Sequence, residues 1–133
     1  MSAIHALSLI ADLFFSMQVE EAARHLGFLV GTVSTPDKAI SALGQGRYRL
    51  FIMDLTAAGD RVTEVLLAAK AAPYPVAVLA FGPHADYEAH QAAGAADADL
   101  VVPKSQFSQD LAKFMIACLD RHRGSVVERG EDA

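Results

Sequence analysis

Short runs of apolar residues alternate along this chain with longer stretches in which apolar residues recur every three or four positions. A short continuous apolar run is typical of a strand that is buried on both faces of a parallel sheet, whereas the longer spacing is typical of a helix with one buried face. The pattern predicts strands at residues 6–11, 28–33, 50–55, 76–81 and 100–103. It predicts helices at residues 13–26, 36–43, 62–71, 86–93 and 107–121.

Local sequence supports several of these boundaries. Gly27 follows the first helix as a glycine commonly does at a helix C-terminus, and Thr35 followed by Pro36 is typical of a helix start. Residues 57–60 are expected to form a loop. The apolar residues that we expect to share the buried face of the first helix are Phe14, Met17, Ala22 and Leu26.

Strict alternation of five strand–helix units favours one class of fold. Consecutive parallel strands joined by right-handed helical crossovers form a sheet with helices on both faces. We therefore expect an α/β protein of the flavodoxin-like, doubly wound type, with strand order 2-1-3-4-5. In such sheets, ligands bind at the carboxyl ends of the strands.

Length and composition fit a single folded domain. The chain has 133 residues, of which 53% are hydrophobic and 20% are charged, so it can bury a core and is too apolar to be disordered. We expect a domain over residues 1–123 and a polar tail over residues 124–133. The lone cysteine, Cys118, lies among apolar residues and is expected at a buried helix position.

Charge and hydropathy exclude two classes of partner. The net charge of −5 argues against a general nucleic-acid binder, which would present a basic face. No stretch approaches the ~20 consecutive apolar residues that span a bilayer. We therefore expect a soluble, cytoplasmic protein with no nucleic-acid or membrane partner.

Charged residues stand where three of the predicted strands end. Asp12 follows the first strand, Asp54 lies at the end of the third, and Lys104 follows the fifth. An acid at the end of a buried strand is costly unless it is paired or used. Because parallel strands end at the same edge of a sheet, these three side chains can converge on one cleft. A strand-end ion pair without a further function is the alternative interpretation.

Three segments give the chain a resemblance to the receiver domains of bacterial response regulators. They are Leu-Phe-Ile-Met-Asp-Leu at 50–55, Gly-Ala-Ala-Asp at 94–97 leading to Val-Pro-Lys at 102–104, and Leu-Gly-Phe at 26–28. The likeness covers residues 4 to about 121, and the order and spacing of the segments are more specific than any one of them. The sequence thus resembles a CheY-like receiver domain, in an atypical or pseudo-receiver form.

The resemblance implies a phosphorylation site. By this likeness Asp54 accepts a phosphoryl group from a histidine kinase or a phosphotransfer protein, and Lys104 pairs with the phosphoryl oxygens. A Mg²⁺ ion would be held by Asp12, Asp54 and the backbone carbonyl of Thr56, since this ion prefers oxygen ligands. Receiver domains are not themselves enzymes, so no enzymatic activity is expected.

The sequence departs from the family pattern at several positions of this machinery. The family carries two adjacent acids at the end of the first strand, but only Asp12 is present, and it comes one position late. Ala80 stands in place of a hydroxyl residue that senses the phosphoryl group, and Val101 in place of an aromatic residue that switches with it. Ser105 replaces the proline that follows the lysine. These departures predict weakened metal binding and a degenerate switch.

A partner surface is expected on the fourth helix, fifth strand and fifth helix. Phe81, Tyr87 and His90 are the residues predicted to contact a downstream protein there. The chain is expected to act as a stand-alone receiver, as a monomer or homodimer, through that partner.

Two alternatives to phosphorelay signalling remain open at this point. The first is a pseudo-receiver that docks partners without phosphorylation, which the departures favour. The second is a small flavodoxin-like enzyme or nucleotide binder. It needs a phosphate-binding loop rich in glycine and hydroxyl residues after the first strand, whereas residues 12–15 are acidic and bulky.

Overall fold

The computed structural model describes residues 3–83, 86–95 and 97–128 of the chain. The strands are β1 (His5–Leu9), β2 (Leu29–Val33), β3 (Leu50–Asp54), β4 (Ala77–Gly82) and β5 (Leu100–Pro103). The helices are α1 (Leu13–His25), α2 (Pro36–Gln45), α3 (Leu55–Ala58), the 3₁₀ turn η1 (Gly59–Arg61), α4 (Val62–Lys70), α5 (Tyr87–Ala95), α6 (Lys104–Phe107) and α7 (Leu111–Glu128).

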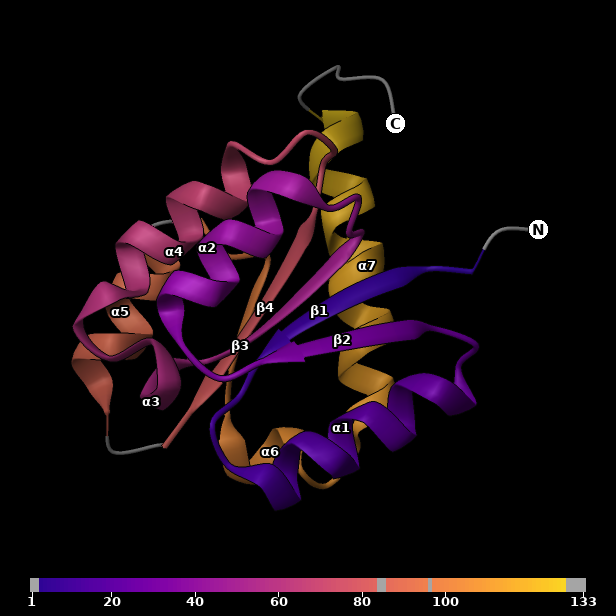
Figure 1. Ribbon diagram of the computed structural model, residues 1–133, viewed down its shortest axis with the longest axis horizontal. Coiled ribbons are helices and arrows are strands. Elements are labelled where there is room, and N and C mark those ends of the chain that lie inside the picture. The colour runs from indigo at the N-terminus through magenta and orange to yellow at the C-terminus, as the bar shows by residue number, and fades with distance from the viewer. Residues whose placement is uncertain (1–2, 84–85, 96, 129–133) are drawn as a thin grey trace.

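The five strands form one parallel sheet in the order β2-β1-β3-β4-β5 (Figure 1). Leu9 of β1 lies opposite Met53 of β3, and Met53 lies opposite Ala80 of β4. The predicted fold class and strand order are therefore confirmed. The carboxyl ends of β1, β3 and β4 lie next to one another at one edge of the sheet.

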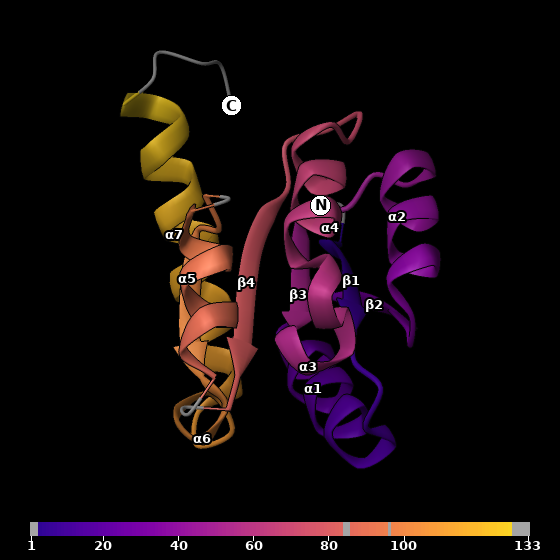
Figure 2. The ribbon, with the colours of Figure 1, turned by 90° about the vertical axis from the view of Figure 1, so that its left-hand side faces the viewer.

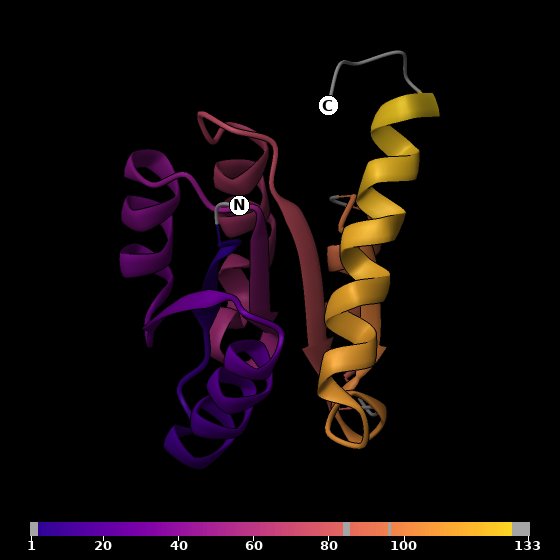
Figure 3. The ribbon, with the colours of Figure 1, turned by 90° about the vertical axis from the view of Figure 1, so that its right-hand side faces the viewer.

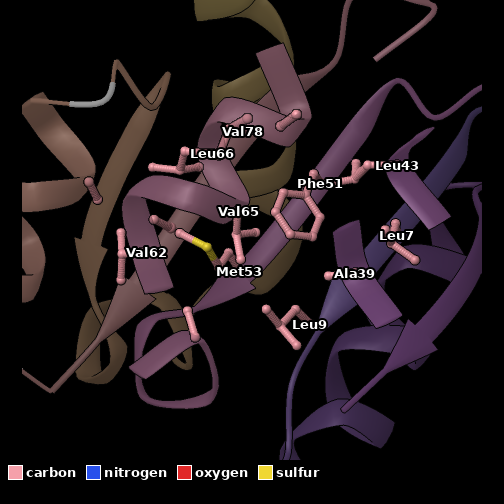
Figure 4. Packing of buried hydrophobic residues seen from close by; sticks show 14 of the residues in the cluster. Leu7, Leu9, Ala39, Leu43, Phe51, Met53, Val62, Val65, Leu66 and Val78 are labelled. Carbon is pink, nitrogen blue, oxygen red and sulfur yellow. The ribbon is translucent and has the colours of Figure 1, made fainter. Parts of the chain in front are cut away.

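Helices cover both faces of the sheet (Figures 1 and 2). One face carries α2, α4 and α5, and the other carries α1, α6 and α7. Between the sheet and the first group lies a core that includes Leu7, Leu9, Phe51, Met53 and Val78 (Figure 4). Between the sheet and the second group lies a separate core that contains four phenylalanines. Burial on both faces explains why β3 and β4 read as continuous apolar runs.

The buried face of α1 differs from the prediction. Phe14 is 82% exposed and Met17 is 56% exposed, whereas Phe15, Val19 and Ala23 are buried. The helix begins after Asp12, and from that start every fourth residue from Phe15 onward faces the sheet. Apolar residues occur on both of these helix faces, so the periodicity of the sequence could not tell which face is buried. The prediction for Phe14 and Met17 was wrong, and these side chains meet solvent.

Several element boundaries also differ. Residues 57–60 were expected to form a loop, but they lie in α3 and η1. The last helix was expected to begin at residue 107, but α7 begins at Leu111, and a separate short helix, α6, precedes it. The Asp110 side chain accepts the N–H of Lys113 and so caps α7. Helix α7 continues to Glu128, past the predicted start of the tail at residue 124, and residues 129–133 lie outside the described part of the chain.

Two smaller predictions are confirmed. Gly27 has φ +83°, the left-handed conformation that ends many helices and that glycine adopts without strain. Cys118 is buried on α7, and burial raises the pKa of its thiol far above the usual range, so it is not a reactive thiolate. Among the described residues, no helix is both long enough and apolar enough to cross a membrane.

Candidate functional site

Asp54 ends β3 at the carboxyl edge of the sheet and, among the residues that the structure describes, is the one charged residue that is buried, with 6% of its surface exposed. Its side chain also caps the short helix α3, because Oδ1 accepts the N–H of Thr56 at 2.9 Å. The change from strand to helix directly after Asp54 therefore fixes where its carboxyl group points. On the next strand, Phe81 lies opposite it.

The charge state of Asp54 results from opposing effects. Burial raises the pKa of this carboxyl above its usual value, and this is the largest effect. The backbone N–H groups of Thr56 and Ala57 and the charge of Lys104 lower the pKa in part, because they stabilise the ionised form. The site thus holds a carboxylate whose negative charge is only partly compensated by the chain itself.

Asp12 lies at the same carboxyl edge of the sheet, and it is the N-cap residue of α1. Its Oδ1 accepts the N–H of Phe15 at 3.3 Å, while its Oδ2 lies 3.9 Å from Nζ of Lys104. The side chain is half-exposed. One carboxylate oxygen therefore caps a helix, and the other faces the cationic side chain that ends the fifth strand.

Lys104 links the two acids. It begins α6 directly after β5, lies beside Asp12 and lowers the pKa of Asp54 through its charge. Its Nζ also lies 4.7 Å from the centre of the Phe15 ring, a cation–π contact that holds the ammonium group over the site. The structure thus brings together Asp12, Asp54 and Lys104, the three residues that the sequence placed at strand ends.

A cluster of aromatic rings beneath Lys104 was not foreseen from the sequence. The ring centres of Phe15 and Phe81 are 5.1 Å apart, those of Phe81 and Phe107 are 5.0 Å apart, and Phe114 extends the cluster. A signal for Phe15 existed, since it follows Asp12 by one helical turn. The rings from α1, β4, α6 and α7 connect the site to one core of the protein.

This cluster corrects one predicted partner contact. Phe81 was expected on an exposed docking surface, but it is fully buried among Phe15 and Phe107. His90 is half-buried, and its Nε2 lies 3.1 Å from the carbonyl oxygen of Pro83. The side chain of Tyr87 lies outside the described part of the structure.

The residues that replace expected site groups are apolar, and two of them, Ile10 and Ala80, are buried. Ile10 and Ala11 stand where the family has its paired acids, and Ile10 is 2% exposed in the core beside the phenylalanines. Ala80 is fully buried next to Met53 on one side and Val101 on the other. Ala80 therefore offers no hydroxyl, and Val101 offers no aromatic ring, to respond to a group bound at Asp54.

The oxygen atoms at this site provide few ligands for Mg²⁺. Within the described ranges of the chain, no three histidine, cysteine or acidic side chains gather into a group that could hold a metal ion. Two carboxylates and a carbonyl oxygen still match the chemistry of Mg²⁺, which commonly binds one or two carboxylates and keeps several waters. Lys104 already partly neutralises Asp12, so the residues present fit a weakly held ion.

Comparison with known proteins identifies the fold. No family model matches the chain, and no curated protein matches it. The CheY-like receiver domain of Methanospirillum hungatei JF-1 superposes with a TM-score of 0.80 at 19% identity, covering 93% of this chain and 99% of that one. The receiver domain of a putative LuxO repressor from Vibrio parahaemolyticus gives 0.77 at 15% identity, over 95% and 97% of the two chains.

A third solved structure is a response regulator protein from Burkholderia pseudomallei with a phosphorylated aspartic acid, a calcium ion and citrate. It superposes with a TM-score of 0.73 at 16% identity and covers 94% of this chain and 72% of that one. All three matches span more than nine-tenths of the present chain, although the sequences have diverged widely. The chain therefore has the fold of the CheY-like receiver domains of response regulators.

Proposed function

We propose that this protein is a receiver in two-component signalling and that Asp54 accepts a phosphoryl group from a histidine kinase or a phosphotransfer protein. The observation that carries the proposal is the placement of a buried carboxylate at the end of β3, with Lys104 beside it and Asp12 within reach of the same lysine. The Burkholderia pseudomallei protein of the same fold has a phosphorylated aspartic acid.

The chain's own residues supply positioning and charge. The N–P bond of the donor's phosphohistidine breaks as an O–P bond to the Asp54 carboxylate forms, and the histidine nitrogen keeps the electron pair. Lys104 then pairs with the phosphoryl oxygens, while the Thr56 N–H holds Oδ1 of Asp54 and so orients the carboxylate. Such transfers depend mainly on positioning and electrostatic stabilisation.

Asp12, Asp54 and the backbone carbonyl of Thr56 are the residues that would hold Mg²⁺. When bound, the ion neutralises negative charge on the transferring group. With Ile10 and Ala11 in place of paired acids, affinity for the ion is expected to be low. Asp12 and Asp54 still provide two carboxylates, which is a sufficient protein contribution for a Mg²⁺ ion that keeps several waters.

The switch that normally follows phosphorylation is proposed to be degenerate. A conformational change needs a group that interacts differently with the two states. Ala80 and Val101 cannot make a hydrogen bond or a ring movement in response to a phosphoryl group. A downstream partner would then recognise the modified site itself or an unchanging surface.

A phosphorylation-independent docking module is the second candidate function. The observation that favours it is a group of exposed apolar side chains on the first turns of α1, where Leu13 is 70% exposed, Phe14 82% and Met17 56%. These residues are spaced so that they share one helix face. They adjoin Asp12, so a protein that reaches Asp54 would contact them as well.

Beryllofluoride, which mimics a phosphoryl group on aspartate, tests the proposal. We expect that beryllofluoride with excess Mg²⁺ shifts the amide NMR signals of Asp54, Thr56 and Lys104. The shifts should vanish in Asp54→Asn. They should persist in Asp60→Asn, a matched control because Asp60 is an exposed aspartate six residues further along the chain.

Either result decides between the two candidates. Saturable shifts that depend on Asp54 support the phospho-acceptor. If no shifts occur at high Mg²⁺, or if they survive Asp54→Asn, the phospho-acceptor is wrong and the docking module stands.

A further inference from the structure

A cavity of about 420 Å³ lies at the opposite end of the sheet from Asp54. It is formed by the chain around the start of β1, the loops that precede β3 and β4, and the C-terminal part of α7. Figure 3 shows that part of α7 beside the amino ends of the strands, while α6 lies at their carboxyl ends. A cavity of this size lies in the range of small-molecule sites, which span about 300–1,000 Å³.

The cavity is cationic in a protein of net negative charge. Arg47, Arg49 and Arg123 line it, together with His5 and His122, and no acidic residue belongs to its lining. Among the described residues, none of the three arginines forms an ion pair, whereas Arg24 and Arg61 elsewhere are both paired with acids. Their charge is therefore available to a ligand.

The rest of the wall is apolar and includes an aromatic ring. Ile4, Tyr74, Pro75 and Leu119 contribute to it. The Arg47 guanidinium lies 5.0 Å from the centre of the Tyr74 ring, a cation–π contact that holds one charge against this surface. An apolar wall with a few converging polar groups is the usual composition of a small-molecule site.

A buried contact keeps the cavity wall in place. Asp99, which precedes β5, accepts the N–H of Val78 at 2.8 Å through Oδ2, and its Oδ1 lies 3.1 Å from Nδ1 of His122. This joins α7 to β4. Nε2 of His122 is covered by protein and has no hydrogen-bond partner in the described part of the chain, so it cannot reach a ligand without a rearrangement. The exposed arginines are the groups that an anion can meet.

We propose that this cavity binds a small organic anion with an apolar or aromatic body and a carboxylate or phosphate group. The body packs against Tyr74 and Leu119, and the anionic group pairs with Arg49 and Arg123. The site is separate from the carboxyl-edge site and does not depend on phosphorylation of Asp54.

Phenyl phosphate and benzoate are suitable probes, because each joins an aromatic ring to an anionic group. Inorganic phosphate is the control for the anion alone, and benzyl alcohol is the control for the apolar body alone. We expect saturable amide NMR shifts around Arg49, Tyr74 and Arg123 with at least one of the two probes. Inorganic phosphate and benzyl alcohol should each bind at least about tenfold more weakly, because each lacks one of the two contributions.

Two arginines of the same helix provide a matched pair of variants. Arg123→Gln should weaken binding of the probe about tenfold or more, since it removes a charge-assisted hydrogen bond. Arg121→Gln removes the same charge from an exposed residue that does not line the cavity, and it should change binding less than about twofold.

The spectrum of each variant without probe shows whether its fold is intact. The proposal is overturned if neither probe gives saturable shifts, if inorganic phosphate binds as tightly as phenyl phosphate, or if both arginine variants weaken binding equally.

Discussion

Asp54 combines two roles that have opposite effects on its charge. As a strand-end residue it is buried, which disfavours the carboxylate, and as the cap of α3 it accepts a backbone N–H, which favours it. Burial dominates, so the pKa lies above the ordinary value of 3.8. The folded protein therefore holds the Asp54 proton more tightly than the unfolded chain does.

This shift predicts how stability depends on pH. Between the ordinary pKa and the raised one, the native state binds more protons, so the contribution of Asp54 to the free energy of unfolding falls as the pH rises. Above both values the full penalty for the buried charge is present. We expect Asp54→Asn, which keeps the shape without the charge, to raise the free energy of unfolding at pH 7 in metal-free buffer.

Urea denaturation across pH measures this effect. The gain from Asp54→Asn should shrink as the pH falls from the raised pKa towards the ordinary value of 3.8, and it should be absent below both, where the wild-type carboxyl is neutral in both states. Asp60→Asn, at an exposed position, is the control. A loss of stability at pH 7 in Asp54→Asn would show that burial does not dominate at this carboxyl.

Asp12 also has two roles, and two substitutions separate them. Asp12→Ala removes the N-cap of α1 and should lower the free energy of unfolding by about 1 kcal/mol. Asp12→Asn keeps a capping oxygen, so its stability should remain close to that of the wild type.

Both substitutions remove the negative charge beside Lys104. Because this carboxylate is also the proposed ligand of Mg²⁺, both substitutions should weaken the Mg²⁺ dependence of beryllofluoride binding to the same degree. If Asp12→Asn leaves that dependence unchanged, Asp12 is a helix cap and takes no part in holding the metal.

At the scale of elements, the orientation of α1 about its own axis decides which of its aromatic side chains pack into the core. Phe15 faces the sheet and packs with Phe81 and Phe107, while its neighbour Phe14 faces solvent. The same rotation places Phe15 beneath Lys104. The orientation of one helix thus sets both the aromatic core and the position of a site lysine.

Alanine substitutions of two phenylalanines test this arrangement. Phe81→Ala should lower the free energy of unfolding by about 3–5 kcal/mol, because it leaves a cavity among buried rings. Phe14→Ala should change it by less than about 0.5 kcal/mol. Chemical denaturation of the two variants gives both values. Similar losses in the two would contradict the assigned face of α1.

At the scale of the whole molecule, the two edges of the sheet carry opposite chemistry. The carboxyl edge holds Asp12 and Asp54 with Lys104, and the amino edge holds an arginine-lined cavity. On the neighbouring strands, Ala80 of β4 and Val101 of β5 lie in line with Met53, the residue before Asp54, and neither carries a polar side chain. We therefore expect that a change at Asp54 is not passed to α5 through polar contacts of Ala80 or Val101.

This isolation predicts a confined response to phosphorylation. In the wild type, amide shifts caused by beryllofluoride should stay within α3, α6 and the end of β3, without reaching α5. Ala80→Ser restores a hydroxyl at the end of β4 and should extend the shifts to β5. Shifts that spread through α5 in the wild type would contradict the degenerate switch.

The sequence by itself determined the order of the strands and helices and the convergence of Asp12, Asp54 and Lys104. Local periodicity identifies buried strands, and the handedness of crossovers leaves few ways to arrange them, so residues at strand ends must meet at one edge. The departures expected at Ala80 and Val101 came instead from the resemblance to receiver domains, because local patterning carries no information about which group a family places there.

Only the tertiary structure decided which face of α1 is buried, where Phe81 lies and how the arginine cavity forms. Apolar residues occur around much of α1, so its orientation depends on packing against β4, α6 and α7 rather than on its own pattern. The cavity is assembled from four segments that are distant along the chain, and none of them carries a motif. Contacts between such distant segments, not local preference, created these features.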